Sequence, residues 1–180
     1  VENIDEKHHI QKHAVFLDNH TLQVGDSIVE AKTIVIATGS SPTVIPKFAE
    51  LGDRLIVNDD IFEWQRLPES VAVFGPGVIG LELGQALHRL GVRIRLFGRS
   101  GSLKPLTDIG IRDYALKVFQ EEFPLDAKAN ILGMERKGEQ VMIRFVDRED
   151  GVEKHENFDY VLAATGRLSL IHISEPTRRS

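Results

Sequence analysis

A glycine-rich turn between two apolar segments constrains the fold of this chain more than any other feature. Residues 71–74 (VAVF) form a short apolar run that is typical of a buried parallel strand, and residues 78–90 repeat apolar side chains at the spacing of an amphipathic helix. Gly75, Gly77 and Gly80 stand at their junction in the pattern G-x-G-x-x-G. The sequence therefore predicts a strand, a tight turn and a helix in direct succession.

Each glycine has a separate physical role in such a turn. The first permits the tight turn, the second leaves bare backbone for a pyrophosphate, and the third lets the helix pack closely on the strand. The helix N-terminus adds unpaired N–H groups and the positive end of the helix dipole. Because residues 93–97 predict a second strand, we interpret the segment as a strand-helix-strand unit that binds a dinucleotide. A glycine-rich turn that serves packing alone is the alternative.

Short runs on both sides of this unit predict further elements. Residues 14–17, 21–24 and 27–31 have the alternation and polar turns of a small antiparallel meander. Residues 108–123 predict a second helix, which Pro124 ends. Four apolar residues are expected on the buried face of this helix: Ile111, Ala115, Val118 and Phe119.

Two continuous apolar runs contain the same Ala-Thr-Gly sequence, at residues 33–42 (TIVIATGSSP) and 160–167 (YVLAATGR). We expect both to be strands that are buried on both faces, as in a parallel sheet. Residues 125–129 predict a third parallel strand, and residues 140–146 and 153–158 predict a second meander. The predicted fold class is α/β: a Rossmann-like domain with a parallel sheet and a β-meander, preceded by an antiparallel β-meander.

Composition excludes several classes of function. A net charge of -5 without a basic cluster argues against nucleic acid as the main partner. No run approaches the roughly 18 apolar residues of a membrane span, and the first residues lack the apolar core of a signal peptide. We therefore expect a cytoplasmic protein that contacts no membrane. The absence of cysteine excludes disulfides, thiolate metal sites and cysteine nucleophiles within this chain.

Neither a metal site nor a catalytic residue is predicted within the chain. His8, His9 and His13 match no recognisable ligand spacing, so a polar strand or linker is the preferred interpretation. Asp59 and Asp60 are adjacent and could form an acid/base pair, but they fit the start of a short helix better, with Asn58 or Asp59 as the N-cap and an acid near the positive end of the dipole.

Three segments together resemble class I of the pyridine nucleotide-disulfide oxidoreductase family. They are IVIATGSSP at residues 34–42, GPGVIGLEL at 75–83 and VLAATGR at 161–167. Their order, with a meander before the first and the third, covers residues 13–167 and is similar to an FAD domain that is interrupted by an NAD(P) domain. Within the family, the sequence of these segments is most similar to that of the dihydrolipoyl dehydrogenases.

The resemblance implies a division of the chain into four parts. Residues 1–40 are the expected C-terminal remnant of an FAD-binding domain, residues 41–69 a connector, and residues 70–167 the NAD(P)-binding domain. Residues 168–180 depart from the family pattern. We expect a non-native junction there, with a disordered native tail as the alternative.

The resemblance also implies residues that contact the two cofactors. Glu82 matches an acid that contacts the nicotinamide carboxamide in the family, and the alternative is a solvated helix glutamate. Val78 stands where some relatives carry a tyrosine gate over the flavin, so we expect no gate. The expected NAD(P) contacts are Gly75, Gly77, Val78, Ile79, Gly80, Glu82, Gly98, Arg99, Ala129 and Gly166. The expected FAD contacts are Ala37, Thr38, Gly39 and Ser40.

The residues after the second strand bear on the choice between NAD and NADP. An acid there accepts hydrogen bonds from the ribose hydroxyls of NAD and repels a 2′-phosphate, whereas an arginine pairs with that phosphate. Gly98 occupies the acidic position and Arg99 follows it. This favours NADP, and the alternative is that Arg99 is a plain surface charge.

By this resemblance the whole protein is a homodimeric, FAD-dependent oxidoreductase that passes a hydride between NAD(P)H and flavin. A small-molecule or lipoyl-type disulfide is the expected substrate, reached through a cysteine pair. The chain holds neither the flavin fingerprint, nor the Cys-x4-Cys segment, nor the His-Glu acid/base pair, so we expect this fragment alone to be inactive. The alternatives are a transhydrogenase or NADH oxidase type of relative without thiol chemistry, and a stand-alone dinucleotide-binding module.

Overall fold

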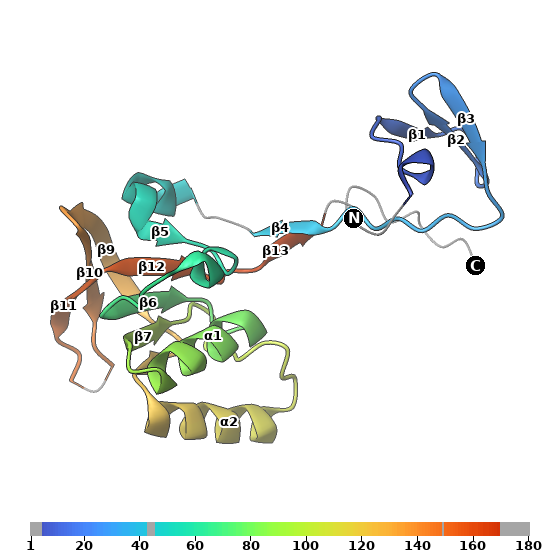
Figure 1. Cartoon of the computed structure of the whole chain (residues 1–180). Coiled ribbons are helices and arrows are strands. Elements are labelled where there is room, and N and C mark those ends of the chain that lie inside the picture. The colour runs from blue at the N-terminus through green and yellow to red at the C-terminus, as the bar shows by residue number, and fades with distance from the viewer. Residues whose placement is uncertain (1–4, 43–45, 149, 170–180) are drawn as a thin grey trace. The chain divides into compact units, whose positions relative to one another are not determined.

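The computed structural model of the chain describes residues 5–42, 46–148 and 150–169. It divides into two compact units, Val1–Gly39 and Ser40–Ser180, which we call the meander unit and the sheet unit (Figure 1). Among the described residues, neither α1 nor α2 has the length and apolar content that a crossing of the bilayer requires.

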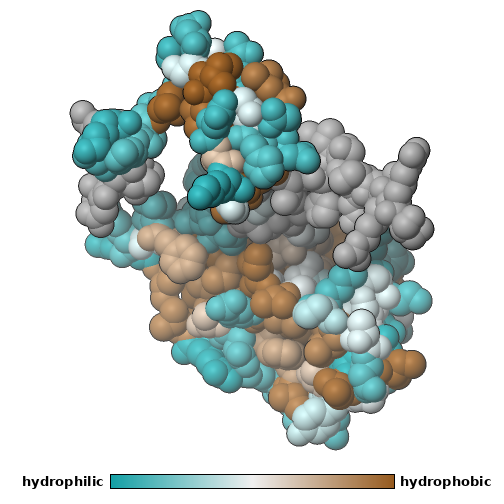
Figure 2. All heavy atoms as spheres, turned by 90° about the vertical axis from the view of Figure 1, so that its right-hand side faces the viewer, coloured by the Kyte–Doolittle hydropathy of each residue, from teal (hydrophilic) through white to brown (hydrophobic). Residues whose placement is uncertain are grey.

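The meander unit consists of one helical turn and three short antiparallel strands. After η1 (Glu6–His8), β1 (Ala14–Phe16), β2 (Thr21–Val24) and β3 (Ser27–Glu30) pair in the order β1-β2-β3. This confirms the predicted meander. Most of its apolar side chains are exposed, and Figure 2 shows hydrophobic residues in brown among the spheres at the top of the view. The exposed apolar residues of these strands and turns include Val15, Phe16, Leu17 and Ile28.

A five-stranded parallel sheet in the order β5-β12-β6-β7-β8 is the centre of the sheet unit (Figure 1). Its strands are β5 (Leu55–Ile56), β6 (Ser70–Phe74), β7 (Arg93–Phe97), β8 (Leu125–Asp126) and β12 (Tyr160–Ala163). The first strand after the connector, the helix and the next strand follow the predicted order: β6, α1 (Val78–Arg89) and β7. The predicted α/β fold is confirmed.

The central strands alternate side chains between two different covering layers, as the period-2 geometry of a strand dictates. Val71 and Val73 of β6 pack with α1 and with α2 (Ile109–Glu122) on one face. Ala72 and Phe74 pack on the other face against η2 (Pro46–Arg54) and against the meander of β9 (Asn130–Lys137), β10 (Gln140–Val146) and β11 (Glu153–Phe158). Every residue of β6 is buried as a result.

The predicted buried strand at residues 33–42 is wrong. Only β4 (Ser40–Pro42) is a strand, and it pairs antiparallel with β13 (Arg167–Ser169). Residues 33–39 belong to no helix or strand, and Val35 is 81% exposed. A strand needs hydrogen-bond partners at its edges, and no described strand pairs with residues 33–39.

Smaller differences have equally local causes. On α2 the predicted buried face is partly wrong, because Ala115 and Phe119 pack on the core whereas Ile111 and Val118 are exposed. Asp108 caps this helix by accepting a hydrogen bond from the backbone N–H of Ile111.

The start of η3 (Asp60–Glu63) also differs from the expected cap. Asp59 stands at its N-cap without a capping side-chain bond, whereas the carboxylate of Asp60 accepts from the backbone N–H of Val57. Residues 170–180, most of the departing tail, lie outside the described residues.

Candidate functional site

A cleft of about 1090 Å³ lies where β6, β7 and β12 end. In parallel sheets, ligands bind at the carboxyl ends of the strands. The described residues that line this cleft are Phe48, Phe74, Gly75, Pro76, Gly77, Phe97, Gly98, Arg99, Ser100, Ser102, Lys104, Ala129, Asn130, Ile131, Met134, Ala164, Thr165 and Gly166. All of them belong to the sheet unit, and they come from the strand ends, from η2 and from the start of the second meander.

Gly75 is the corner at which β6 turns toward α1. Its φ of +111° lies in a region that favours glycine, and a side chain there would overlap the carbonyl oxygen of Ala164. Backbone hydrogen bonds join this corner to both neighbouring strands: the N–H of Gly75 donates to Phe97 at 2.9 Å, and that of Ala164 donates to Phe74 at 2.8 Å. The rim of the cleft is therefore a hydrogen-bonded frame.

Gly77 leaves bare backbone at the start of α1. It is the N-cap residue, no side chain caps the helix, and the first turn carries no acid. An added Cβ at Gly77 would meet nothing within 4 Å, whereas one at Gly80 would lie 3.1 Å from the carbonyl carbon of Gly75. The second glycine of the pattern thus borders open space, and the third allows close packing of helix and turn. This arrangement can accept an anion at the helix N-terminus.

The loop after β7 holds no carboxylate at the position where an NAD-binding acid is expected. A Cβ on Gly98 would lie 2.7 Å from Cγ of Pro76 and would overlap the carbonyl oxygen of Ala127, so no side chain fits there as the chain is folded. Three backbone bonds fix this loop to the end of β8 and the residues after it: Gly98 N–H to Asp126 O at 2.7 Å, Gly101 N–H to Ala127 O at 2.8 Å and Ala129 N–H to Gly98 O at 2.8 Å.

Among the described residues that line the cleft, the charged ones are both cations, Arg99 and Lys104. Both are exposed, and no hydrogen bond or ion pair joins either side chain to another described residue. The nearby acid Asp126 is engaged elsewhere, because its carboxylate accepts from the N–H of Lys128 and lies 3.5 Å from the guanidinium of Arg148. The cleft is therefore electropositive, although the chain carries a net charge of -5.

An aromatic wall closes the inner side of the cleft. Phe48 lies 5.0 Å from Phe74, and Phe74 lies 5.1 Å from Phe97, measured between ring centroids. Phe97 in turn contacts Phe145 of β10. The inner wall of the cleft is therefore part of the hydrophobic core of the sheet unit.

The predicted cofactor residues are distributed over three places. Those that line the cleft are Gly75, Gly77, Gly98, Arg99, Ala129 and Gly166. Val78, Ile79, Gly80 and Glu82 lie in the first turns of α1, with Val78 and Glu82 exposed. Ala37, Thr38 and Gly39 lie exposed in the meander unit, Ser40 begins β4, and none of these four lines the cleft. Cofactor contacts at all of these residues stay predictions.

Several lining residues were not predicted. Ser100, Ser102 and Lys104 follow Arg99 closely in the sequence, so the position after the second strand was the signal that could have identified them. Phe48 and Met134 come from η2 and β9, far from the glycine pattern in the sequence. No local pattern indicates that these two residues reach the cleft.

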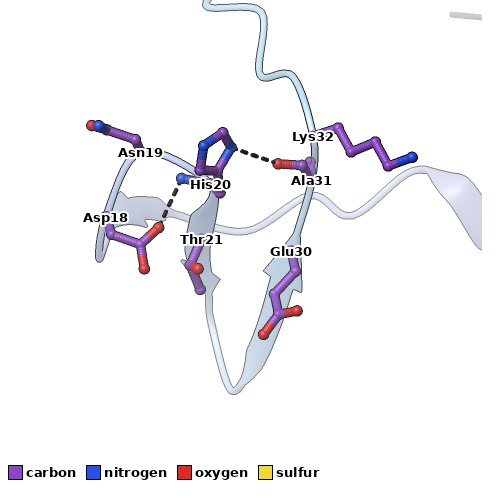
Figure 3. A pocket seen from close by; sticks show the side chains of 7 residues that line it. All are labelled: Asp18, Asn19, His20, Thr21, Glu30, Ala31 and Lys32. Atoms are coloured by element: carbon purple, nitrogen blue, oxygen red, sulfur yellow. Dashed lines mark hydrogen bonds between the residues drawn. The ribbon is translucent and has the colours of Figure 1, made fainter.

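A second, shallow hollow lies in the meander unit, lined by Asp18, Asn19, His20, Thr21, Glu30, Ala31 and Lys32 (Figure 3). Within it, the backbone N–H of His20 donates to the Asp18 carboxylate at 2.7 Å, and Nδ1 of His20 lies 3.2 Å from the carbonyl oxygen of Ala31. The first of these bonds is the main cause that lowers the pKa of Asp18. The first bond closes the turn before β2, and the second joins this turn to the residue that follows β3. Among the described residues, no group of three or more His, Cys, Asp or Glu is placed to hold a metal ion.

A family model and the similar curated proteins point to the same family. The family model described as pyridine nucleotide-disulphide oxidoreductase matches residues 1–173. A mercuric reductase from Staphylococcus aureus is 32% identical over 161 residues, which are 88% of this chain and 29% of that protein. A dihydrolipoyl dehydrogenase from Buchnera aphidicola subsp. Schizaphis graminum is 26% identical over 162 residues, 88% of this chain and 34% of that protein. The chain thus spans about a third of the length of these curated relatives.

A solved structure has the same fold. The Cu(II) complex of the HOCl-induced flavoprotein disulfide reductase RclA from Escherichia coli matches this chain with a TM-score of 0.68 at 20% sequence identity. The match covers 89% of this chain and 36% of that chain. At this identity the similarity is evidence for the fold alone.

Proposed function

Since the chain belongs to the pyridine nucleotide-disulphide oxidoreductase family, as its sequence motifs suggested, we propose that it forms the nicotinamide nucleotide-binding part of an FAD-dependent oxidoreductase. Residues 70–167 are the proposed NAD(P)-binding domain, and residues 1–40 are proposed to belong to an FAD-binding domain. The whole protein is proposed to act, as a homodimer, on a small-molecule or lipoyl-type disulfide. This chain contains no cysteine, so it supplies no thiol for that step itself.

The observation that carries the proposal is the open backbone at Gly77, at the uncapped N-terminus of α1 and inside the cleft. A pyrophosphate placed there would accept hydrogen bonds from the first N–H groups of α1 and would lie at the positive end of the helix dipole. Gly75 and Gly80 support this, because they bring turn, strand and helix close enough to leave the backbone accessible.

The remaining groups of the dinucleotide have candidate partners around the cleft. Gly166 and Ala129 border it from the ends of β12 and β8, and Glu82 lies one turn into α1, where we propose that it contacts the nicotinamide carboxamide. The bound NAD(P)H would supply the hydride. The residues of this chain would hold and orient the nucleotide. Residues 37–39 belong to the meander unit, and the FAD contacts proposed for them rest on the family resemblance.

NADP is the proposed form of the nucleotide. The site offers Arg99 to a 2′-phosphate, and Gly98 leaves no room for the acid that would bind the ribose hydroxyls of NAD. An arginine fork pairs well with phosphate. We therefore expect Arg99→Ala to weaken NADPH binding about tenfold, the loss of one charge-assisted contact, and to leave NADH binding unchanged.

The test is calorimetric titration of the 180-residue chain with NADPH and NADH. Gly77→Ala is the decisive variant, because its φ of -89° accepts alanine while the methyl group enters the open space. We expect at least about tenfold weaker binding of both nucleotides. Gly110→Ala on α2, away from the cleft, is the matched control and should bind as the wild type does. A folded wild-type chain that binds neither nucleotide would overturn the proposal.

A further inference from the structure

The two methionines carry all the sulfur of this chain, because it contains no cysteine. They are Met134 and Met142, which lie on the neighbouring antiparallel strands β9 and β10. Both residues are half-buried. A thioether is an apolar, flexible group, and oxidation to the sulfoxide makes it polar and chiral. What such an oxidation changes depends on the surroundings of each methionine.

The register of β9 and β10 places the two methionines on opposite faces of the second meander. Met134 lies directly across from Ile143, which is completely buried in the cluster between the meander and the parallel sheet. Met142 lies across from Glu135, which is exposed. Directly opposed residues of an antiparallel pair share a face, and successive residues alternate. Met134 therefore faces the sheet, and Met142 faces away from it.

Met134 is also part of the wall of the cleft. It lines the cleft and packs against the apolar cluster that contains Phe48, Phe74 and Phe97. Met142 is absent from the described residues that line the cleft. A sulfoxide oxygen on Met134 needs a hydrogen-bond donor, and the apolar side chains of this cluster offer none. Oxidation of Met134 would thus alter the surface against which a ligand lies, whereas oxidation of Met142 would alter the outer face of the meander.

On the basis of the proposed nucleotide site, we propose that Met134 is a site of reversible oxidation by peroxides, which lowers the affinity of the cleft for nicotinamide nucleotides. The sulfur lone pair attacks one oxygen of hydrogen peroxide, so that an S–O bond forms and the O–O bond breaks. The other oxygen leaves as water after it takes up the proton of the transferred hydroxyl. The sulfur loses two electrons and the peroxide gains them. Methionine sulfoxide reductases return the sulfoxide to the thioether.

Binding and oxidation should oppose each other at this site. A nucleotide in the cleft would cover the sulfur of Met134 and leave that of Met142 accessible. NADH at saturating concentration should therefore slow the oxidation of Met134 and not that of Met142. This protection distinguishes a sulfur in the binding wall from one whose oxidation only disturbs the fold.

The experiment is calorimetric titration of the 180-residue chain with NADH before and after treatment with hydrogen peroxide, with peptide mass spectrometry to assign each added oxygen. We expect the oxidised wild type to bind NADH about tenfold more weakly, the effect of one unsatisfied polar group in an apolar wall. Treatment with a methionine sulfoxide reductase should restore the affinity.

Three variants assign the effect to one sulfur. Met134→Leu keeps the volume but cannot form the sulfoxide, so its NADH affinity should be the same before and after peroxide. Met142→Leu is the matched control and should lose affinity on treatment as the wild type does. Met134→Gln is polar without being oxidised, so it should bind NADH weakly before any peroxide is added.

Distinct outcomes overturn the two proposals. Unchanged NADH affinity after complete oxidation of Met134 would overturn the oxidation site, as would an equal loss of affinity in peroxide-treated Met134→Leu. Oxidation of Met134 at one rate with and without NADH would show that the nucleotide does not cover it, with the same consequence. A folded, untreated wild type that binds no NADH would instead contradict the proposed nucleotide site, and this inference with it.

Discussion

Two segments of this chain contain the same Ala-Thr-Gly sequence after an apolar run, and they have opposite structures. Tyr160–Ala163 is β12, the second strand of the parallel sheet, and its Val161 and Leu162 are completely buried. In residues 33–39, Val35 is 81% and Ile36 53% exposed, and no described strand pairs with them. The apolar pattern is shared, but the neighbours are not.

The difference lies in what surrounds each segment. β12 pairs with β5 on one edge and with β6 on the other, and its two faces are covered by the helices and by the second meander. A run of apolar residues that is buried on both faces is stable only when both edges and both faces have partners. The apolar pattern thus indicates that a segment needs partners at both edges and on both faces. Whether it has them depends on the rest of the fold.

The largest expected effect tests burial directly. Leu162→Ala should lower the free energy of unfolding by about 2 to 5 kcal/mol, because it leaves a cavity in the core. Ile36→Ala should change it by less than about 0.5 kcal/mol, as exposed substitutions do. Urea unfolding can be followed by the fluorescence of Trp64, the one tryptophan of the chain, which packs on Tyr160 of β12 at 5.4 Å between ring centroids.

Circular dichroism should be recorded in parallel, because Ile36 lies in the other unit and Trp64 does not report on it. If Ile36→Ala destabilises the chain as much as Leu162→Ala does, the contrast between the two segments is wrong. A conservative Leu162→Met variant, which keeps the volume, should cost less than about 1.5 kcal/mol.

An intermediate effect is expected at the start of β12, where Asp159 joins three strands. Its carboxylate accepts hydrogen bonds from the backbone N–H groups of Glu69 and Ser70, each at 2.9 Å, and from the side-chain amide of Gln140 at 3.0 Å. Burial raises the pKa of Asp159, but these hydrogen bonds outweigh it and hold the pKa below its usual value. Asp159→Asn should therefore cost about 1 to 3 kcal/mol at neutral pH.

The pH dependence gives this prediction its sign. Because the pKa of Asp159 is lower in the folded state, its contribution is fully present above the unfolded pKa of about 3.9 and is lost as the pH falls through the folded pKa. The difference between wild type and Asp159→Asn in urea unfolding should accordingly be constant from pH 7 to about 5 and shrink in acid.

The meander unit offers the comparison variant. Asp18→Asn removes a carboxylate whose pKa is also lowered, by the N–H of His20, but which is exposed and ties one turn only (Figure 3). It should shift the urea midpoint less than Asp159→Asn does at every pH. A larger shift from Asp18→Asn would mean that the meander unit depends on this turn more than its exposed surface indicates.

Elements with a strong local pattern were predicted well, and elements made by long-range pairing were not. The helix expected at residues 78–90 and the strand expected at 93–97 are α1 and β7. β5 has two residues, too few for any pattern, and it exists because β12 pairs with it. β9 contains Gly133 and several charged residues, which weaken strand propensity, and it is held by its pairing with β10.

The candidate site follows the same rule. The separate roles expected for Gly75, Gly77 and Gly80 agree with the space around each of them, because these roles depend on one turn and its adjacent helix. The aromatic wall around Phe48 is assembled from segments that meet only in the folded sheet unit. Sequence alone therefore predicted the glycine turn of the candidate site but not the residues that form the back of the cleft.

The smallest expected effect concerns Val35. Val35→Thr replaces an exposed apolar side chain, so the free energy of unfolding should change by less than about 0.5 kcal/mol, while binding of the dye ANS, which reports exposed hydrophobic surface, should fall. The same substitution at Val161 places a hydroxyl in the core and should cost about 1 to 3 kcal/mol. ANS fluorescence and urea unfolding should be measured on both variants. If Val35→Thr is as destabilising as Val161→Thr, residues 33–39 are packed in solution, and the two Ala-Thr-Gly segments are more alike than their exposures indicate.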